Sequence, residues 1–160
     1  MSRTNYTIRK AVINDLDDII QLCGEHAEYE KAEYNPINKK EKLGKHLFKE
    51  NPSAYCLVVE VGNKLMGFAT FSFEFSTWNA AFYLHMDCLF LRPSLRGLSI
   101  GAELVKTIKD FAIKYDCSLI QWQTPVFNER AINFYNKLGV NSKDKLRFYL
   151  DVELKTDKAI

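Results

Sequence analysis

The chain has few of the residues that build metal centres or disulfide frameworks. Its 160 residues include only four cysteines and three histidines. No two cysteines form a Cys-x-x-Cys pair, so the sequence predicts no metal site. Each cysteine lies in an apolar stretch, which is typical of buried, reduced thiols in a cytoplasmic protein. The four are Cys23, Cys56, Cys88 and Cys117.

Long apolar runs and a strong charge of either sign are also missing. The apolar runs are far shorter than the roughly 20 residues that a membrane helix needs. Residues 1–5 are not followed by the apolar region of a signal peptide, so we expect a cytoplasmic protein without a membrane partner. The net charge is only +2 and the lysines of residues 39–45 are interrupted by Glu41, so we expect no nucleic-acid partner.

What remains is an ordinary soluble composition, with 47% hydrophobic and 26% charged residues. Repeats, low-complexity tracts and interdomain linkers are absent, and the length suits one core, so residues 1–160 are interpreted as a single domain. Asn14 is the predicted N-cap of a helix over 14 to about 30, and Tyr34-Asn35-Pro36 ends it.

Hydrophobic periodicity predicts a mixed order of strands and helices. Antiparallel hairpins come first and a β-α-β-α-β segment follows, so the fold class is α+β (mixed α/β). The predicted strands are 6–11, 55–61, 65–75, 81–91, 118–123 and about 146–153, and the predicted helices are 14–30, 38–49, 100–115 and 128–138.

The loop after the strand over 81–91 is the most informative segment. It carries Arg96, Gly97 and Gly101 and leads directly into a patterned helix. A helix N-terminus presents unpaired N–H groups and a positive dipole end, and glycine lets an anion approach closely. The loop therefore predicts a cradle for a phosphorylated cofactor, with a plain turn as the alternative. The spacing fits neither a dinucleotide fingerprint nor a Walker A loop.

Two segments resemble the GNAT superfamily of N-acetyltransferases. Residues 96–101, Arg-Gly-Leu-Ser-Ile-Gly, are similar to its acetyl-coenzyme A signature, and residues 128–139, Asn-Glu-Arg-Ala-Ile-Asn-Phe-Tyr-Asn-Lys-Leu-Gly, are similar to its second hallmark. The resemblance covers residues 6 to about 152 and implies a mixed sheet of six to seven strands with helices on both faces. Residues 68–78 and 82–97 resemble the diamine and polyamine branch. The sequence differs from the family pattern at two positions. Ser99 stands where the loop of the family has a glycine, and Cys88 stands where the polyamine enzymes have a second acidic residue.

The resemblance implies acetyl-CoA as cofactor. Backbone N–H groups of residues 97–102 would hold its pyrophosphate with Arg96, and the pantetheine arm would pair with the free backbone of the strand that ends at Leu91. The implied cofactor-binding residues are Leu89, Phe90, Leu91, Arg96, Gly97, Leu98, Ser99, Ile100, Gly101, Ala102, Asn128, Ala131 and Phe134.

Tyr135 is the implied general acid. Attack of an amine on a thioester expels a thiolate, and a phenol with a reference pKa of about 10 can protonate it. Without the resemblance, Tyr135 would be interpreted as a core residue, because it shares a helical stripe with Ala131, Phe134 and Leu138.

The acceptor amine must lose a proton before it attacks. Holding an alkyl amine neutral at pH 7 costs about 4.6 kcal/mol. Asp87 is the implied base through a water, and a salt-bridged or capping acid is the alternative. His85 is the rival base, since strand alternation places it on the same face as Asp87.

The acceptor pocket is the least defined part. By family analogy, the first two helices and the turn near Trp78 line it, and Glu25, Glu28 and Tyr29 belong to an acidic run that would attract a cationic amine. A solvated helix face is the alternative for the run, and a sheet-edge cover is the alternative for Trp78.

The sequence thus predicts an enzyme that transfers acetyl from acetyl-CoA to a primary amine of a small molecule, diamine- or polyamine-like, by direct attack in a ternary complex. An aminoglycoside, an amino acid or a protein N-terminus are alternative acceptors. A non-catalytic acyl-CoA-binding module is an alternative class. Homodimers are common among the relatives that the resemblance implies, and the oligomeric state stays open.

Overall fold

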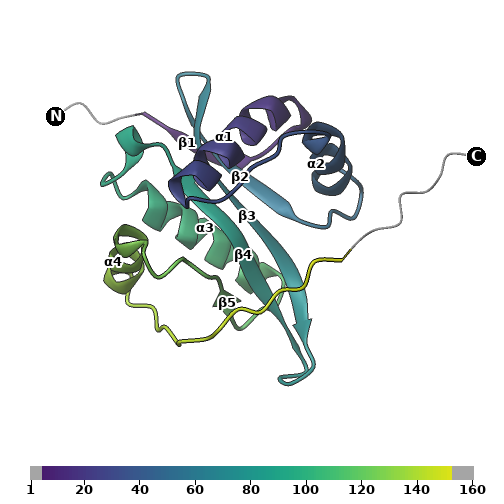
Figure 1. Ribbon diagram of the computed structural model, residues 1–160, viewed down its shortest axis with the longest axis vertical. Coiled ribbons are helices and arrows are strands. Elements are labelled where there is room, and N and C mark those ends of the chain that lie inside the picture. Colours follow the sequence, from purple (N-terminus) through teal and green to yellow (C-terminus); the bar gives the residue numbers. More distant parts are fainter. Residues whose placement is uncertain (1–4, 153–160) are drawn as a thin grey trace, which may run out of the picture.

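A five-stranded mixed sheet organises the protein (Figure 1). The computed structural model describes residues 5–152. The strand order is β1-β2-β3-β4-β5, with β1 Thr7–Lys10, β2 Tyr55–Val61, β3 Lys64–Ser76, β4 Ala81–Leu91 and β5 Ile120–Gln121. The first four strands pair antiparallel and β4 pairs with β5 in parallel. The predicted mixed α/β class and its antiparallel first half are confirmed.

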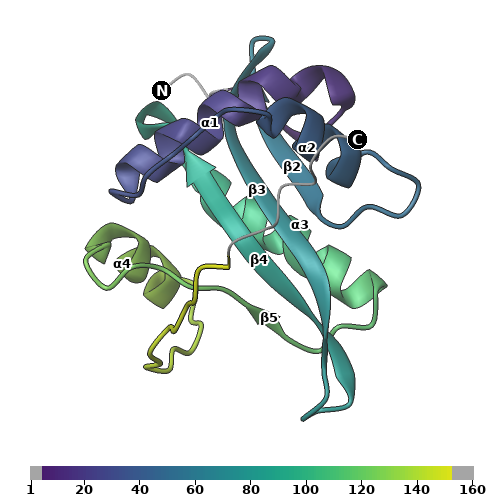
Figure 2. The ribbon, with the colours of Figure 1, turned by 45° about the vertical axis from the view of Figure 1, so that its right-hand side comes forward.

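Helices cover both faces of this sheet (Figure 2). Helices α1 Leu16–Tyr29 and α2 Lys39–Leu47 lie on one face, and α3 Ile100–Lys114 lies on the other with α4 Glu129–Lys137 near its beginning. Each face has its own core. Ile19 and Leu22 pack against Phe68 and Phe90 below α1, whereas the larger core under α3 is built around Phe71, Leu104 and Ile108. Across residues 5–152, no helix is both long and apolar enough to cross a membrane.

The first helix begins differently from the sequence prediction. Residues Ile13–Asp15 form a 3-10 turn, and Asp15 rather than Asn14 occupies the N-cap of α1. The carboxylate of Asp15 accepts hydrogen bonds from Arg9 Nη1 and Nη2 at 2.7 and 2.9 Å and from the backbone N–H of Val12 at 2.8 Å. These three donors favour an ionised carboxylate at position 15, because each of them stabilises its negative charge. This cluster fastens α1 to the edge strand β1.

Asp15→Asn is expected to lower the free energy of unfolding by about 2 kcal/mol near neutral pH, because charge-assisted hydrogen bonds are replaced by neutral ones. Arg9 holds the pKa of the Asp15 carboxyl below its ordinary value of 3.8. A lowered folded-state pKa contributes stability above the unfolded-state value, and that contribution is lost as the pH falls below about 3.8. Urea unfolding at pH 7 and pH 3 should show a smaller difference between wild type and variant at the lower pH.

The C-terminal part has fewer strands than predicted. β5 spans two residues instead of six, and residues 146–152 of the predicted last strand form no strand, while residue 153 lies outside the described part. Leu146, Phe148 and Leu150 are each more than 80% exposed. Alternating apolar residues indicate a face that can be buried, but a strand also needs a neighbour for its backbone. Over the described residues the sheet therefore has five strands, not six to seven.

Candidate active site

A cleft of about 850 Å³ lies between β4, the end of α1, the loop before α3, and α4. Its size suits a drug-sized or cofactor-sized ligand. Most of the predicted cofactor residues line it: Leu89, Phe90, Leu91, Arg96, Gly97, Ser99, Gly101, Ala102, Asn128, Ala131 and Phe134. Two predicted residues do not. Leu98 is 46% exposed, and the Ile100 side chain is fully buried in the core.

The cleft opens where β4 and β5 separate. Their pairing consists of Leu84 with Ile120 and His85 with Gln121. Beyond His85, β4 continues to Leu91 with its other edge paired to β3. From Met86 to Leu91, one edge of β4 therefore has no strand partner and faces the cleft. An extended ligand can pair with such an edge as an added strand does. The predicted separation of these two strands is confirmed.

A β-bulge interrupts β4 at Asp87. Thr70 of β3 pairs with Cys88, and Phe71 pairs with Met86, so Asp87 has no partner on β3. On either side of the bulge, Met86 and Leu89 both pack toward the core under α3. A bulge re-aims side chains and breaks strict alternation. The register shift falls beyond Met86, so it does not separate His85 from Asp87, and their common face stays a prediction. Asp87 lines the cleft, whereas His85 is not among the lining residues.

The loop before α3 is held in left-handed backbone geometry. Gly97 has φ +81° and Ser99 has φ 64°. A Cβ added to Gly97 would meet nothing within 4 Å, so this side of the loop is open. Ser99 precedes Ile100 without capping the helix through its side chain. The first N–H groups of α3 are thus left for a ligand, and such a concave run of N–H groups suits a phosphate.

Ser99→Gly is expected to raise the free energy of unfolding by about 1 kcal/mol, because a side chain in the left-handed region is strained and glycine is not. Urea denaturation measures the change. Ser94→Gly is the matched control, since Ser94 lies in the 3-10 turn Pro93–Leu95 and should lose stability on the same substitution. Equal destabilisation by both variants would contradict strain at Ser99.

Arg96 is fixed before any ligand arrives. Its Nε donates to the Leu91 carbonyl at 2.8 Å, and its guanidinium lies 4.5 Å from the Tyr29 ring centroid and 5.5 Å from that of Phe90. Burial lowers the pKa of Arg96 from its ordinary value. Arginine nevertheless stays charged at physiological pH. Its charge is therefore preorganised at the side of the cleft where the loop begins.

Asn128 connects two walls of the cleft. Its Oδ1 accepts from the Ala131 N–H at 3.2 Å and so caps α4, and it also accepts from the Tyr29 hydroxyl at 3.1 Å. Asn128 is 7% exposed. A buried amide oxygen that accepts from the first turn of α4 and from a hydroxyl on α1 holds the two helices in place. Tyr29, predicted to bind the acceptor, thus lies on the Arg96 side and joins α1 to α4.

Tyr135 projects from α4 into the same cleft. Its ring lies 5.0 Å from that of Trp122 and 5.1 Å from that of Phe134. None of the hydrogen bonds within residues 5–152 uses its hydroxyl. Burial, with a smaller contribution from the charge of Glu30, raises the pKa of Tyr135 to about 12. The phenol therefore keeps its proton at every physiological pH and can donate it in the cleft.

Two further residues at the end of α1 line the cleft: His26, which the sequence analysis did not select, and Glu30, which belongs to the predicted acidic run over 25–33. His26 Nε2 lies 3.3 Å from Glu30 Oε1. The imidazole stacks on Phe90 at 5.3 Å and meets Phe68 edge-on at 6.1 Å. His26 and Glu30 continue, at helical spacing, a stripe of the buried Ile19 and Leu22 and the half-buried Cys23. That stripe is a sequence signal which could have indicated both residues.

The predicted acceptor residues are not brought together. Glu25 forms a two-pronged ion pair with Arg92, at 2.7 and 2.9 Å, which ties α1 to the end of β4. Glu28 is exposed on α1. Trp78 is 95% exposed at the tip of the β3–β4 hairpin, at the opposite end of β4 from the loop that begins α3 (Figure 1). None of these three lines the cleft.

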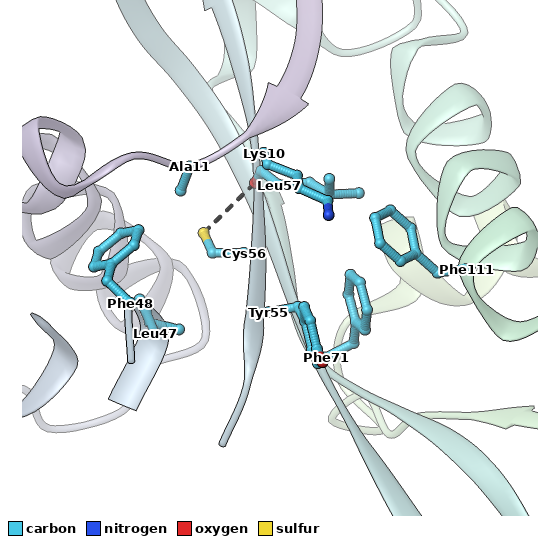
Figure 3. Close-up of a pocket in the computed structure, with 9 residues that line it drawn as sticks. All are labelled: Lys10, Ala11, Leu47, Phe48, Tyr55, Cys56, Leu57, Phe71 and Phe111. Carbon is cyan, nitrogen blue, oxygen red and sulfur yellow. Dashed lines mark hydrogen bonds between the residues drawn. The ribbon is translucent and has the colours of Figure 1, made fainter. Parts of the chain in front are cut away.

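A second hollow is too small to hold a ligand of the size that the cleft can hold. Figure 3 shows it on either side of β2, with Cys56 among Ala11, Leu47 and Phe48, and with Tyr55, Phe71 and Phe111 beyond. Its volume is about 60 Å³, whereas ligand pockets usually measure about 300–1,000 Å³. Burial raises the pKa of the Cys56 thiol to about 12, so this thiol is unreactive.

Comparison with known proteins identifies the family. The model of the acetyltransferase (GNAT) family matches residues 14–140, most of the chain. This chain belongs to the acetyltransferase (GNAT) family. Thialysine N-epsilon-acetyltransferase of Mus musculus is 30% identical over 140 residues, which is 82% of each chain. Spermidine/spermine N(1)-acetyltransferase-like protein 1 of Homo sapiens is 29% identical over 84% of this chain and 20% of its own length.

The solved structures agree with this GNAT fold. Aminoglycoside N-acetyltransferase AAC(6')-Iy, in complex with CoA, has a TM-score of 0.77 over 92% of this chain and 95% of its own, at 15% identity. At that identity the likeness concerns the fold alone. The family assignment makes the protein an N-acetyltransferase that acts on amines, and GNAT acetyltransferases use acetyl-CoA. The relatives are consistent with the diamine and polyamine branch.

Proposed function

We propose that this GNAT protein transfers acetyl from acetyl-CoA to a primary amine of a small, cationic acceptor of the diamine, polyamine or thialysine type. The observation that carries the proposal is the Tyr135 hydroxyl in the same cleft as the free β4 edge and the open start of α3. The named relatives support the acceptor class.

The residues of the cleft fit acetyl-CoA. The N–H groups of Gly101 and Ala102 and the charge of Arg96 would hold its pyrophosphate, and the unpaired backbone beyond His85 would hold its pantetheine arm. The side of Gly97 where a Cβ would stand is open, which leaves room for an anion. Acetyl-CoA supplies a thioester, whose acyl carbon accepts the amine and whose thiolate leaves.

Direct attack by the amine is favoured over an acyl-cysteine intermediate. Cys88 lines the cleft, but burial raises the pKa of its thiol to about 12. A thiol is nucleophilic as a thiolate, and at pH 7 a group with such a pKa is almost fully protonated. Asp87, aimed at the cleft by the bulge, would attract and orient the cationic amine, whose proton leaves through water.

A panel assay tests the function. Thiol release from acetyl-CoA is followed with spermidine, a short diamine, thialysine, lysine, an aminoglycoside and an N-terminal peptide as acceptors. We expect amine-dependent release that is fastest with the small cationic acceptors. Release with no acceptor, or CoA binding with no release, would refute the transferase and favour a binding module. Faster release with the aminoglycoside or the peptide would refute the acceptor class alone.

A further inference from the structure

The His26–Glu30 pair is the only contact within 4 Å between a histidine nitrogen and a carboxylate oxygen among the residues that the structure describes. It lies in the cleft on the wall opposite α4, with 14% of the His26 side chain and 30% of the Glu30 side chain exposed. A pair of this kind on a solvated helix face would be much more exposed and weakly coupled. Here Phe68 and Phe90 fix the plane of the imidazole.

The orientation of the pair leaves one ring nitrogen available. Nε2 faces the Glu30 carboxylate, and no hydrogen bond within residues 5–152 uses Nδ1. A neutral imidazole carries a lone pair on one ring nitrogen that can accept a proton, and a carboxylate 3.3 Å from the other nitrogen stabilises the imidazolium that forms. The charge of Glu30 contributes to the raised pKa of Tyr135, and both residues line the cleft, so the pair and the phenol face the same space.

On the basis of the proposed function, we propose that His26 takes the proton of the acceptor ammonium, directly or through one water, and that Glu30 holds the resulting imidazolium. A carboxylic acid with a reference pKa of about 3.9 binds a proton weakly at pH 7, whereas an imidazole with a reference value of about 6.5 accepts it readily. His26 therefore replaces His85, which does not line the cleft, as the imidazole base.

The protons balance in this scheme. The ammonium gives one proton to His26 and becomes a neutral amine, whose lone pair forms the C–N bond. When the C–S bond breaks, the thiolate takes the proton of Tyr135. The nitrogen then loses its second proton, which restores the Tyr135 phenol, and His26 returns the first proton to solvent. No oxidant or other co-reactant is needed.

The test is the pH dependence of kcat/KM with spermidine in wild type, His26→Asn and Glu30→Gln. The other charged or titratable groups that line the cleft are unchanged in these variants: Tyr29 on α1, Asp87 and Cys88 on β4, Arg96 before α3, and Glu129, Arg130, Tyr135 and Lys137 on α4. We expect His26→Asn to lower kcat/KM about tenfold or more at pH 7 and to lose the rising limb that wild type shows. The deficit should shrink toward pH 10, because the fraction of neutral amine in solution rises as the pH approaches the reference pKa of about 10.4.

Glu30→Gln keeps the helix and a polar partner but removes the charge that favours imidazolium, so its rising limb should move to lower pH. His46→Asn is the control, because His46 of α2 contacts Ser53 outside the cleft. Unmoved pH profiles in both variants, or a deficit in His26→Asn that is equal at every pH, would overturn the inference. Activity with no amine in wild type would instead overturn the proposed function, and misfolding of His26→Asn would leave Glu30→Gln to decide.

Discussion

Tyr135→Phe is expected to lower kcat by about a hundredfold while CoA affinity changes less than threefold. Burial raises the pKa of Tyr135 to about 12, and a free thiol has a reference value of about 8.5. A stepwise transfer from the phenol to a free thiolate would thus cost about 5 kcal/mol. The transfer must therefore accompany C–S cleavage, with the nitrogen proton restoring the phenol. Phenylalanine keeps the ring contacts with Trp122 and Phe134 but has no proton to give.

Steady-state kinetics and calorimetry separate these effects. Tyr83→Phe is the control, since it removes a phenol that donates to Glu74 at 2.6 Å on the hairpin, away from the cleft. The Tyr135 phenol stays protonated to about pH 12, so the wild-type profile should show no falling limb from this group below pH 10. If Tyr135→Phe turns over like wild type, another proton donor serves the thiolate.

Gly101→Val is expected to reduce CoA affinity by two orders of magnitude or more. Gly101 is buried, and a Cβ at its position would lie 3.0 Å from Phe134 Cζ. Phe134 lines the cleft, so the valine side chain would push it into the space that the cofactor needs. Overpacking of this kind also costs about 1–3 kcal/mol of stability. Calorimetry measures the affinity, and urea denaturation measures the stability.

A second glycine provides the matched comparison. Gly44 of α2 faces Leu16 Cδ1, where a Cβ would come within 3.3 Å, and it lies outside the cleft. Gly44→Val should destabilise the protein without changing CoA affinity. Gly101→Ala adds a single methyl and should lose less affinity than Gly101→Val. Undiminished affinity in a folded Gly101→Val variant would refute the cofactor site at the start of α3.

Much of the scaffold could be predicted because its signals are local. The hairpin turn at Gly62 and Asn63 and the stripe of Leu104 and Ile108 each depend on residues close in sequence. The last strand could not be predicted in this way. The alternation of Leu146, Phe148 and Leu150 indicates only an apolar face. A strand also needs a neighbouring strand to pair with, and the residues of that neighbour can lie far away in the sequence.

The candidate site, like the fold, could be predicted where its signals are local and not where they depend on distant residues. The loop of Arg96 and Gly97 and the helix of Tyr135 were found from short motifs, and the structure brings them to one cleft. The bulge at Asp87 left no trace in the sequence, because Met86, Cys88 and Leu89 give both faces of β4 apolar residues. Glu25 was selected for its charge, but an acidic helix face shows neither which acid will find an arginine nor which will face the cleft.

One helix carries residues proposed for both halves of the reaction. Near its C-terminal end, α1 carries Tyr29, which contacts Arg96 and Asn128, and one turn earlier it carries His26. Ligands that displace a shared element are thermodynamically coupled, and the coupling is reciprocal. If acetyl-CoA repositions Arg96, the acceptor affinity changes by the same factor by which the acceptor alters that of acetyl-CoA. The coupling between the two binding events is then carried by this one helix.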